Sequence, residues 1–504
     1  MVEHCIHIAG VIGSNPIPPT RGSKRKSNGA SRKGRRPQVP ALPTMNQNCQ
    51  RQHGSWQIIN NIMIFEVFLD QLTLNLSQER KISFASKAAK EGAMAKGAGV
   101  KLQEELFLEK TIGVFTQNEL TQKIERAIEN KKPLRIKHGI DPTSKGLHLG
   151  HYVVLRKLRV LQKLGHQIIF LVGDFTAMIG DPSDKASERK PLTEEEVKEN
   201  VKGFKKQIGK FLDLSGQRGL KGVKMVYNSQ WLKKMSLNKF LPLTSLITVS
   251  QMLERENFAK RFKENKPISI REFLYPFLQG YDSVELEADI EIGGTDQTFN
   301  MLVGRQIQEV YHQKPQVVIT LPLLLDIQGK KMSKSVGNCI FLADKPGDIF
   351  GKIMSISDNL LKDYFLFLTD ISFSDWQRIE NEMKIGYNPK KIKEVLAQLV
   401  TAELYTSEIA ITEKEKFNRL FSQKIITSKD VQEIITERPI KLIDLLLEKK
   451  IIKSKSQLRR LITEKAIKLI KGNKQTTISN PDYLIKESGS IFKVGKKIFI
   501  KVVF

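Results

Sequence analysis

Two histidines of this chain have the residue type and spacing to bind an anion. His148 and His151 stand three apart in the stretch GIDPTSKGLHLGHYVV, 139–154, and Gly150 lies between them. An imidazole can coordinate a metal, pack in a core or donate a hydrogen bond to a phosphate. No cluster of further ligands stands nearby in the sequence, which disfavours a metal. Gly150 has no Cβ and lets a flat ring approach the backbone, but these residues alone leave core packing and an anion site open.

A second cationic group lies far downstream. The stretch GKKMSKSVGN, 329–338, contains Lys331, Ser333 and Lys334 between glycines. A loop of this composition suits a polyphosphate, because lysine is a compact charge on a flexible stem. The alternative is a solvated charged loop, which is the usual state of a run of lysines.

The elements around the two histidines favour the anion site. The sequence predicts a strand over 133–140, a helix over 152–166 and a buried strand over 167–174. Strand, helix and strand at this spacing indicate a βαβ unit and therefore a parallel sheet. The histidine loop then lies at the carboxyl edge of the sheet, where α/β proteins bind ligands. The N-terminus of the following helix directs N–H groups at the same loop.

The remaining patterns predict an α/β chain in three parts. Helical apolar spacing covers 102–115 and 118–132, and a later buried strand covers 315–325. The tail from Ile440 predicts two short helices followed by strands. We therefore expect a Rossmann-like domain with a parallel sheet over 94–340, an α-helical domain over 341–437 and a small α+β domain over 438–504.

Composition narrows the class of partner and compartment. The 504 residues carry a net charge of +28 and are 40% hydrophobic, so the chain can bury several cores and suits a polyanionic partner. A basic surface without such a partner is the alternative. Cys5, Cys49 and Cys339 are far apart, which gives no sign of a disulfide framework or a zinc site and fits a reducing, cytoplasmic compartment. No apolar run reaches the roughly 20 residues of a membrane span.

Residues 1–93 differ from the rest of the chain. Lys and Arg crowd a Gly/Ser-rich stretch over 21–36 that has no acidic residue, a composition typical of disorder. The segment could be an RNA-binding arm or a transit peptide. We favour a third interpretation, because 13–20 resembles the translated T-arm of a tRNA gene. On that interpretation the sequence begins upstream of the true start codon, with Met94 as the expected start and an earlier methionine as the alternative.

Two motifs taken together resemble a known family. HLGH, 148–151, followed by KMSKS, 331–335, resembles the signature pair of class I aminoacyl-tRNA synthetases. The tail over 442–472 resembles an S4-type RNA-binding domain, and the whole resemblance covers roughly 100–504. Three further segments resemble the tyrosyl-tRNA synthetases in particular: YPFLQGYDS (275–283), GGTDQTFNMLVGR (293–305) and GDFTAMIGDPS (173–183).

The resemblance implies a tyrosine–tRNA ligase that acts in two steps. Tyrosine attacks the α-phosphate of ATP and releases pyrophosphate, and the 3′ end of tRNA(Tyr) then takes the tyrosyl group from the adenylate. Mg²⁺ would accompany ATP, and no structural metal bound by the protein is expected. The resemblance implies catalytic contacts to the phosphates from His148, His151, Lys331 and Lys334, with Gly150 and Ser333 also contacting ATP.

The resemblance also implies a pocket for tyrosine. Asp181 would bind the ammonium group, and Asp282 would accept the phenolic O–H. The alternatives are a turn role for Asp181 and core packing for Tyr275. The implied tyrosine-binding residues are Asp141, which contacts the amino acid or the nucleotide, Asp181, Tyr275, Gln279, Asp282 and, near the carboxylate, Gln297.

The first strand departs from the better-known bacterial branch of the family. That branch places a tyrosine beside the substrate hydroxyl, whereas this chain has Lys137 and His138 there. The difference indicates the other bacterial branch, which carries KMSKS in full. It leaves the second partner of the phenol open, so Asp282 bears more of that role.

The basic tail predicts contacts to tRNA. Lys455, Arg459 and Arg460 would meet the tRNA backbone, with a solvated helix face as the alternative. Family membership implies a homodimer. A tryptophanyl-tRNA synthetase is an alternative that Gln279 and Asp282 disfavour. A catalytically retired RNA-binding protein is another, disfavoured because the motif histidines and lysines are all present.

Overall fold

The computed structural model of the chain describes part of its length. Most of the predicted leader, 1–93, lies outside the described residues, as do Ser333 and Lys334 of the lysine loop. In the portion that is described, no helix is long and apolar enough to cross a membrane. The described residues are 65, 68–69, 93–144, 146–183, 192–217, 220–332, 339–422, 431–436, 439–471, 474–495 and 498–504.

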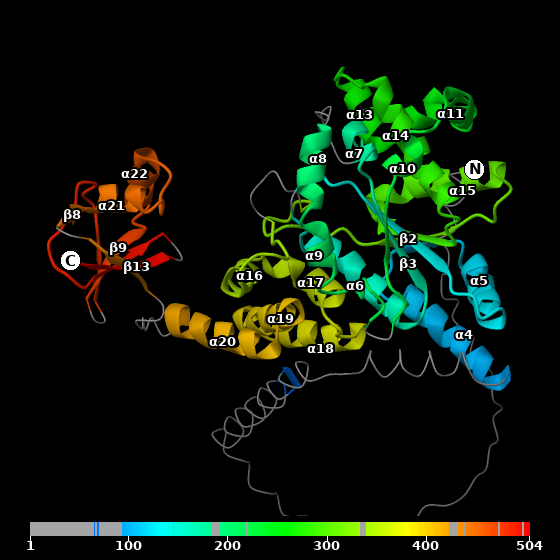
Figure 1. The fold of residues 1–504 in the computed structure, drawn as a ribbon. Helices are drawn as coiled ribbons and strands as arrows, with labels where there is room; N and C mark the ends of the chain where they lie inside the picture. The colour runs from blue at the N-terminus through cyan, green and yellow to red at the C-terminus, as the bar shows by residue number, and fades with distance from the viewer. Residues whose placement is uncertain are drawn as a thin grey trace, which may run out of the picture. The chain divides into compact units, whose positions relative to one another are not determined.

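A six-stranded sheet organises the part of the chain that carries the predicted site (Figure 1). Its order is β1-β6-β5-β2-β3-β4, and strands β2 to β6 run parallel, which confirms the predicted α/β class with a parallel sheet. The chain winds from β2 towards β4 and then, from β5, towards β6. The neighbours β2 and β5 therefore form the switch point at which such sheets bind ligands. The strands are β1 Gly113–Phe115, β2 Arg135–Ile140, β3 Gln167–Val172, β4 Lys224–Tyr227, β5 Ile290–Gly294 and β6 Val317–Leu321.

The prediction of a helix over 102–115 is wrong at its end, where the chain forms strand β1. Helix α4, Ala93–Leu108, covers only the first part of that stretch. Residues 113–115 form β1, which pairs antiparallel with β6 at the edge of the sheet. β-branched residues near this point, Ile112 and Val114, favour a strand over a helix. The sheet is therefore parallel with one antiparallel edge strand.

Helices α6, α14 and α15 cover the sheet where the site lies. Helix α6, Leu149–Lys163, begins after its N-cap residue His148. It ends before Gly165, whose φ of +94° is one that glycine adopts freely. Helix α14, Ile270–Glu285, packs closely on α15, Thr298–Val310. The other helices of this part are α5 Gln117–Glu129, α7 Thr176–Ile179, α8 Glu194–Val201, α9 Phe204–Ile208, α10 Ser229–Leu232, α11 Leu237–Thr244, α12 Val249–Leu253, α13 Glu256–Lys263 and the 3-10 turn η2 Thr295–Gln297.

Successive side chains of a strand point to opposite faces of the sheet, so neighbouring residues belong to different cores. Phe170 of β3 belongs to the large core that includes α6, whereas its neighbour Leu171 packs with Leu286 at the end of α14. The same period of two applies to β2. Ile136 lies in the α6 core, and Lys137 is directed to the α14 side.

Between Pro346 and Ser422 the chain is mainly helical, within the range 341–437 for which the sequence predicts a helical domain. Phe65, which falls within the predicted leader, is 1% exposed and packs edge-to-face on Tyr387 with ring centroids 4.8 Å apart. Arg378 lies 4.0 Å from the ring centroid of Phe68, so these leader residues contribute to the core here. The helices are α16 Pro346–Ile353, α17 Leu361–Leu368, α18 Phe373–Lys384, α19 Pro389–Leu404 and α20 Ser407–Phe417, with short turns η3 Asp358–Leu360 and η4 Asn418–Ser422.

The C-terminal part has its own sheet and core. The sheet order is β10-β9-β12-β13-β7, and the β13–β7 pair is parallel while the others are antiparallel. The strand β7 precedes residue 438, so this sheet begins before the predicted boundary. The two predicted short helices are present as α21 Leu442–Glu448 and α22 Lys455–Thr463. The strands are β7 Gln432–Ile435, β8 Ile440–Lys441, β9 Ile467–Lys471, β10 Lys474–Thr477, β11 Leu484–Ile485, β12 Ser490–Val494 and β13 Ile498–Val503.

Candidate active site

A cavity of about 400 Å³ opens at the carboxyl edge of the parallel sheet. Its lining includes residues at the ends of all five parallel strands: Asp141, Gly173, Asn228, Gly294 and Pro322. The predicted ATP and tyrosine residues that the structure describes all line it: Asp141, His148, Gly150, His151, Asp181, Tyr275, Gln279, Asp282, Gln297 and Lys331. The fold therefore brings together residues spread over nearly 200 positions of the sequence.

His148 and His151 are anchored to the start of α6 through their Nδ1 atoms. His148 Nδ1 accepts a hydrogen bond from the Gly150 N–H at 3.2 Å, and His151 Nδ1 accepts one from the His148 N–H at 3.1 Å. We infer that each ring carries its proton on Nε2, because Nδ1 acts as an acceptor. A Cβ on Gly150 would lie 3.0 Å from His148 Cε1, so glycine makes room for the ring.

The histidine pair has an arrangement that suits an anion. The ring centroids lie 3.9 Å apart and both rings line the cavity. Two Nε2–H donors at a helix N-terminus suit a negatively charged group. Within the described residues, no group of three or more His, Cys, Asp and Glu side chains converges as a metal site would.

Lys331 is the described lysine of the KMSKS motif. Its Nζ lies 3.0 Å from Asp296 Oδ2, and its side chain is about one third exposed, at 36%. Asp296 belongs to η2, immediately after β5. Lys331 lines the same cavity as the two histidines. Lys334 and Ser333 lie outside the described residues, so their contacts stay predictions.

Asp141 holds two neighbouring side chains at the end of β2. Its Oδ1 accepts from Thr176 Oγ1 at 2.7 Å, and its Oδ2 accepts from the Tyr275 hydroxyl at 3.0 Å. A Cβ on Gly173 would lie 2.1 Å from that Oδ1, so this arrangement requires glycine. Burial, and then the charge of Asp141, raise the pKa of Tyr275 well above its usual value. Tyr275 therefore stays a protonated donor, oriented by Asp141 at the cavity wall.

Asp181 combines a turn role with a place in the cavity. Its Oδ1 accepts from the Ser183 N–H at 2.9 Å, as the turn alternative predicts, and its Oδ2 accepts from Gln297 Nε2 at 2.7 Å. Gln297 Oε1 in turn accepts from Asn300 Nδ2 at 3.1 Å. The carboxylate is thus fixed in position while it lines the cavity, where it can face a cationic group.

Asp282 is the most deeply buried carboxylate of the cavity wall. It is 1% exposed; its Oδ1 accepts from Trp231 Nε1 at 2.8 Å, and its Oδ2 accepts from Asn228 Nδ2 at 3.3 Å. Burial raises its pKa to about 7, against the opposing effects of the Lys137 charge and of the two hydrogen bonds. A carboxylate has about four acceptor positions. Asp282 can therefore accept a further O–H from a ligand.

Lys137 and His138 of β2, which stand where the better-known bacterial branch has a tyrosine, lie in different places. His138 lines the cavity, and its Nδ1 lies 2.8 Å from the Ile292 carbonyl oxygen. Burial lowers the pKa of His138, which favours a neutral ring. Lys137 is 0% exposed and forms an ion pair with Glu291 at 3.0 Å, behind the cavity wall. Lys137 therefore does not take the place of a tyrosine at the ligand hydroxyl.

Sequence reasoning missed three residues that fix the acidic side chains. Thr176 contacts Asp141, and Asn228 and Trp231 contact Asp282. A signal existed for Asn228, because it follows a short apolar strand at the sheet edge where ligand residues gather. Trp231 and Thr176 reach their partners only through tertiary packing, which no local pattern indicates.

The predicted RNA-binding residues lie on one helix of the C-terminal part. Lys455, Arg459 and Arg460 are exposed on α22, whereas Leu458 is buried. Arg460 Nε lies 3.7 Å from Glu464 Oε1 in an exposed i,i+4 pair, which contributes little stability. The helix thus packs by its apolar face and presents cations to solvent.

A known protein family matches the part of the chain that carries the cavity. The family model described as tRNA synthetases class I (W and Y) matches residues 129–422. Every residue that lines the cavity falls within this range.

Curated relatives resemble the chain over most of its length. It is 43% identical to the tyrosine–tRNA ligase of Desulfotalea psychrophila over 406 residues, which is 80% of this chain and 98% of that protein. It is 45% identical to the tyrosine–tRNA ligase of Mannheimia succiniciproducens over 380 residues, which is 75% of this chain and 93% of that protein. A C-terminally truncated mitochondrial tyrosyl-tRNA synthetase of Aspergillus nidulans has a similar fold, with a TM-score of 0.51 at 20% identity over 68% of this chain and 99% of that one.

Proposed function

Because this chain belongs to the tyrosyl-tRNA synthetases of class I and is a tyrosine–tRNA ligase, we propose that L-tyrosine and ATP react in the cavity at the β2–β5 switch point. The buried Asp282, held by two donors and still able to accept an O–H, is the observation that carries this proposal. This family membership disfavours both alternatives, a tryptophanyl-tRNA synthetase and a catalytically retired RNA-binding protein. The relatives that match over most of the chain are tyrosine–tRNA ligases.

Tyrosine binds with its two ends at two different carboxylates. The phenolic O–H donates to Asp282 at one end of the cavity, and the ammonium group meets Asp181 at the other. Tyr275 and Gln279 line the wall between them, and both assist the ammonium. Gln297, already bonded to Asp181, lies near the substrate carboxylate. A phenylalanine would leave the buried Asp282 without its partner, which makes the analogue costly.

The substrates supply their own nucleophiles in both steps. The tyrosine carboxylate attacks the α-phosphate of ATP and expels pyrophosphate, and a ribose hydroxyl of tRNA(Tyr) then takes the tyrosyl group. The protein positions the reactants and stabilises the charge that develops on the phosphates. The Nε2–H groups of His148 and His151 donate to the phosphates from the α6 side. The KMSKS motif supplies the other phosphate contacts, Lys331, Lys334 and Ser333, and Mg²⁺ arrives bound to ATP.

The proposal is tested by tyrosine-dependent ATP–pyrophosphate exchange in an Asp282→Ala variant. We expect exchange with tyrosine to be lost and the preference for tyrosine over phenylalanine to collapse, because no carboxylate then accepts the phenol. The matched control is Asp213→Ala, which removes another buried carboxylate that does not line the cavity. Unchanged discrimination against phenylalanine in a folded Asp282→Ala protein would refute the assignment.

The C-terminal part is proposed to be an S4-like domain that binds tRNA. Its separate core and the exposed cations on α22, Lys455, Arg459 and Arg460, support this role. Since β7 belongs to the C-terminal sheet, a clean deletion ends the chain at residue 422 rather than at 438. We expect such a chain to retain adenylate formation and to lose much of its tRNA charging. Equal charging by the two chains would contradict the role.

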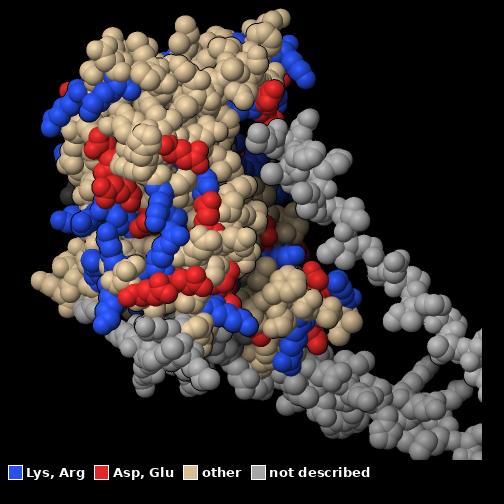
Figure 2. Space-filling view, turned by 90° about the vertical axis from the view of Figure 1, so that its right-hand side faces the viewer, with Lys and Arg blue, Asp and Glu red and all other residues tan. Residues whose placement is uncertain are grey.

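We also propose that the enzyme is a homodimer, as its family resemblance implies. Several large apolar side chains between α11 and α14 are more than half exposed, among them Leu237 at 71%, Phe262 at 63% and Ile270 at 78%. Figure 2 shows the side that carries α11 and α15, and its upper part is mostly without charged side chains. Exposed apolar patches of this kind mark interfaces. Sedimentation of the full chain and of Leu237→Lys tests this, because a monomer in both cases would contradict it.

A further inference from the structure

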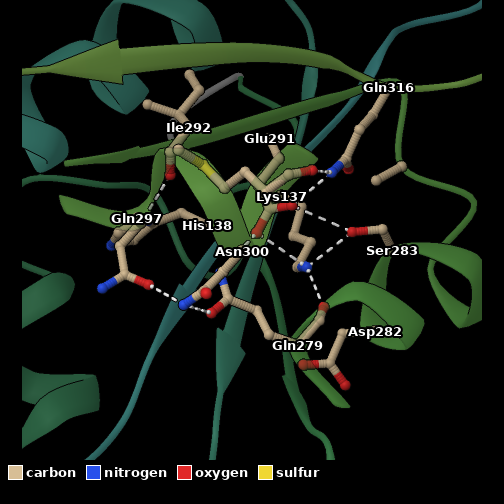
Figure 3. Close-up of polar contacts among 12 residues, drawn as sticks. Lys137, His138, Gln279, Asp282, Ser283, Glu291, Ile292, Gln297, Asn300 and Gln316 are labelled. Atoms are coloured by element: carbon tan, nitrogen blue, oxygen red, sulfur yellow. Dashed lines mark hydrogen bonds and ion pairs between the residues drawn. The ribbon is translucent and has the colours of Figure 1, made fainter. Parts of the chain in front are cut away.

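A buried ion pair contributes to the wall of the proposed tyrosine cavity, at the switch point of the sheet. Lys137 of β2 and Glu291 of β5 face each other in register, with Lys137 Nζ 3.0 Å from Glu291 Oε1. The two side chains are 0% and 2% exposed. Figure 3 shows Lys137 among the polar residues that connect the two strands with α14. Buried charges need several partners, because desolvation is costly.

The ammonium group of Lys137 connects the sheet to helix α14. Besides Glu291, it donates to the Gln279 carbonyl oxygen at 3.1 Å and to Ser283 Oγ at 2.8 Å. Three acceptors match the three N–H donors of an ammonium group. Gln279 and Ser283 flank Asp282 on α14, so Lys137 fixes the helical turn that carries the two cavity residues.

Glu291 completes the same arrangement from β5 and itself lines the cavity. Its Oε2 accepts from Gln316 Nε2 at 2.5 Å and from Ser283 Oγ at 3.2 Å. Gln279 Oε1 accepts from Asn300 Nδ2 at 3.1 Å. Asn300 also donates to Gln297, which bonds to Asp181. The side-chain contacts therefore continue from the ion pair to Asp181, the proposed partner of the substrate ammonium group.

We propose that Lys137 and Glu291 are positioning residues for tyrosine recognition, which hold Gln279 and Asp282 in place and set the charge next to Asp282. The proposal rests on the tyrosine pocket proposed above. It assigns a role to the lysine that stands where the better-known branch has a tyrosine. Lys137 acts on the substrate through its neighbours, because its side chain does not reach the cavity.

The positioning role of Lys137 and Glu291 should be visible in the pH dependence of tyrosine binding, because both charges act on the pKa of Asp282. Lys137 from β2 lowers the pKa of Asp282, whereas burial and Glu291 from β5 raise it, to about 7 in total. Tyr275 lies on the same helix and is uncharged, and Trp231 and Asn228 contribute neutral donors. The Lys137 effect is the larger of the two charge effects. Removing both charges therefore raises the pKa of Asp282.

The decisive variant is the double substitution Lys137→Met with Glu291→Gln. It removes both buried charges together, so neither is left without its partner, whereas each single substitution leaves one unpaired. In tyrosine-dependent exchange, we expect the KM for tyrosine to rise by about ten-fold or more while the KM for ATP changes less than about two-fold. Discrimination against phenylalanine falls, and the pH below which tyrosine binding weakens moves upward.

A second buried pair, which joins α13 to α14, provides the matched control. Arg261 and Glu272 are 2.5 Å apart at side-chain exposures of 0% and 4%, and neither lines the cavity. The double variant Arg261→Met with Glu272→Gln tests whether losing any buried pair gives the same result. We expect its KM for tyrosine and its pH profile to match the unmodified enzyme at a temperature where both are folded.

The outcomes separate this inference from the proposed pocket. A folded Lys137→Met, Glu291→Gln protein with an unchanged KM for tyrosine and an unchanged pH profile would overturn the positioning role. The pocket would still stand in that case if Asp282→Ala abolishes exchange. Equal changes in KM for tyrosine and for ATP, or the same changes in the Arg261 control, would show a merely structural pair and would likewise overturn the inference.

Discussion

The two halves of the proposed active site, one for the amino acid and one for the nucleotide, differ in how their side chains are held. In the amino-acid half, buried side chains bond to other side chains, and Asp282, Glu291 and Lys137 are 0–2% exposed. In the nucleotide half, His148 and His151 bond to the backbone of a helix start, and Lys331 is about one third exposed, at 36%. The first arrangement suits recognition of a fixed shape, because a buried network is costly to distort. The second suits phosphates that move during the reaction.

This difference implies that variants in the two halves should change different kinetic constants. Removing a group that acts on developing phosphate charge lowers kcat, whereas removing a group that binds tyrosine in the ground state raises its KM.

The largest effect is expected at His148. Asn at this position keeps an oxygen that can accept the Gly150 N–H and cap α6, but it loses the donor at Nε2. We expect His148→Asn to lower kcat for adenylate formation by about 10²- to 10³-fold with little change in the KM for tyrosine.

The matched variant at the same position is His148→Gln, whose amide nitrogen reaches further than that of Asn. We expect it to retain more activity than His148→Asn in pre-steady-state measurement of adenylate. The reverse order would show that the cap at α6, and not the donor at Nε2, is what the reaction needs.

A smaller effect is expected at Asp181 in the amino-acid half. A charge-assisted hydrogen bond is worth roughly 1.5–3 kcal/mol, so Asp181→Asn should raise the KM for tyrosine by about 10- to 150-fold. Exchange assays at varied tyrosine measure this, with Asp213→Asn as the control outside the cavity. A fall in kcat at constant KM would show that Asp181 acts on the reaction and not on tyrosine binding.

The pH dependence should also differ between the halves. Asp282 has a pKa raised to about 7 by burial, so its carboxylate is protonated as the pH falls through that value. A protonated carboxyl accepts the phenol less well, so the KM for tyrosine should rise by up to about ten-fold per pH unit below 7. The KM for ATP should not follow. A KM for tyrosine that is constant between pH 8 and 6 would contradict this role for Asp282.

The smallest effect is expected outside both halves, on α22. Arg459→Ala should weaken tRNA charging a few-fold. If the side chain contacts one phosphate, the plot of log binding constant for tRNA against log salt concentration should become less steep by roughly one unit. Adenylate formation should not change. Lys198→Ala on α8 removes an exposed cation elsewhere and serves as the control. An equal effect of both variants would show a general charge effect rather than a contact.

The sequence predicted the elements of the site better than its contacts. Periodicity located β2, α6 and β3, since alternation and helical spacing are local properties. It failed for β1, because three residues at a sheet edge carry too little pattern. The motif residues could be assigned to a common site, but the partners of Asp282 could not, since Asn228 and Trp231 lie more than 50 positions away in sequence. Lys137 was recognised as unusual, but its burial against Glu291 depends on the β2–β5 pairing.

If tyrosine binds as proposed, its phenol lies at Asp282 and its ammonium group lies at Asp181. A crystal structure of the full chain with L-tyrosine tests this binding mode. We expect the phenolic oxygen within hydrogen-bonding distance of Asp282 and the amino nitrogen within that distance of Asp181, with Lys137 still paired to Glu291. Tyrosine bound in the opposite direction, or outside this cavity, would contradict it.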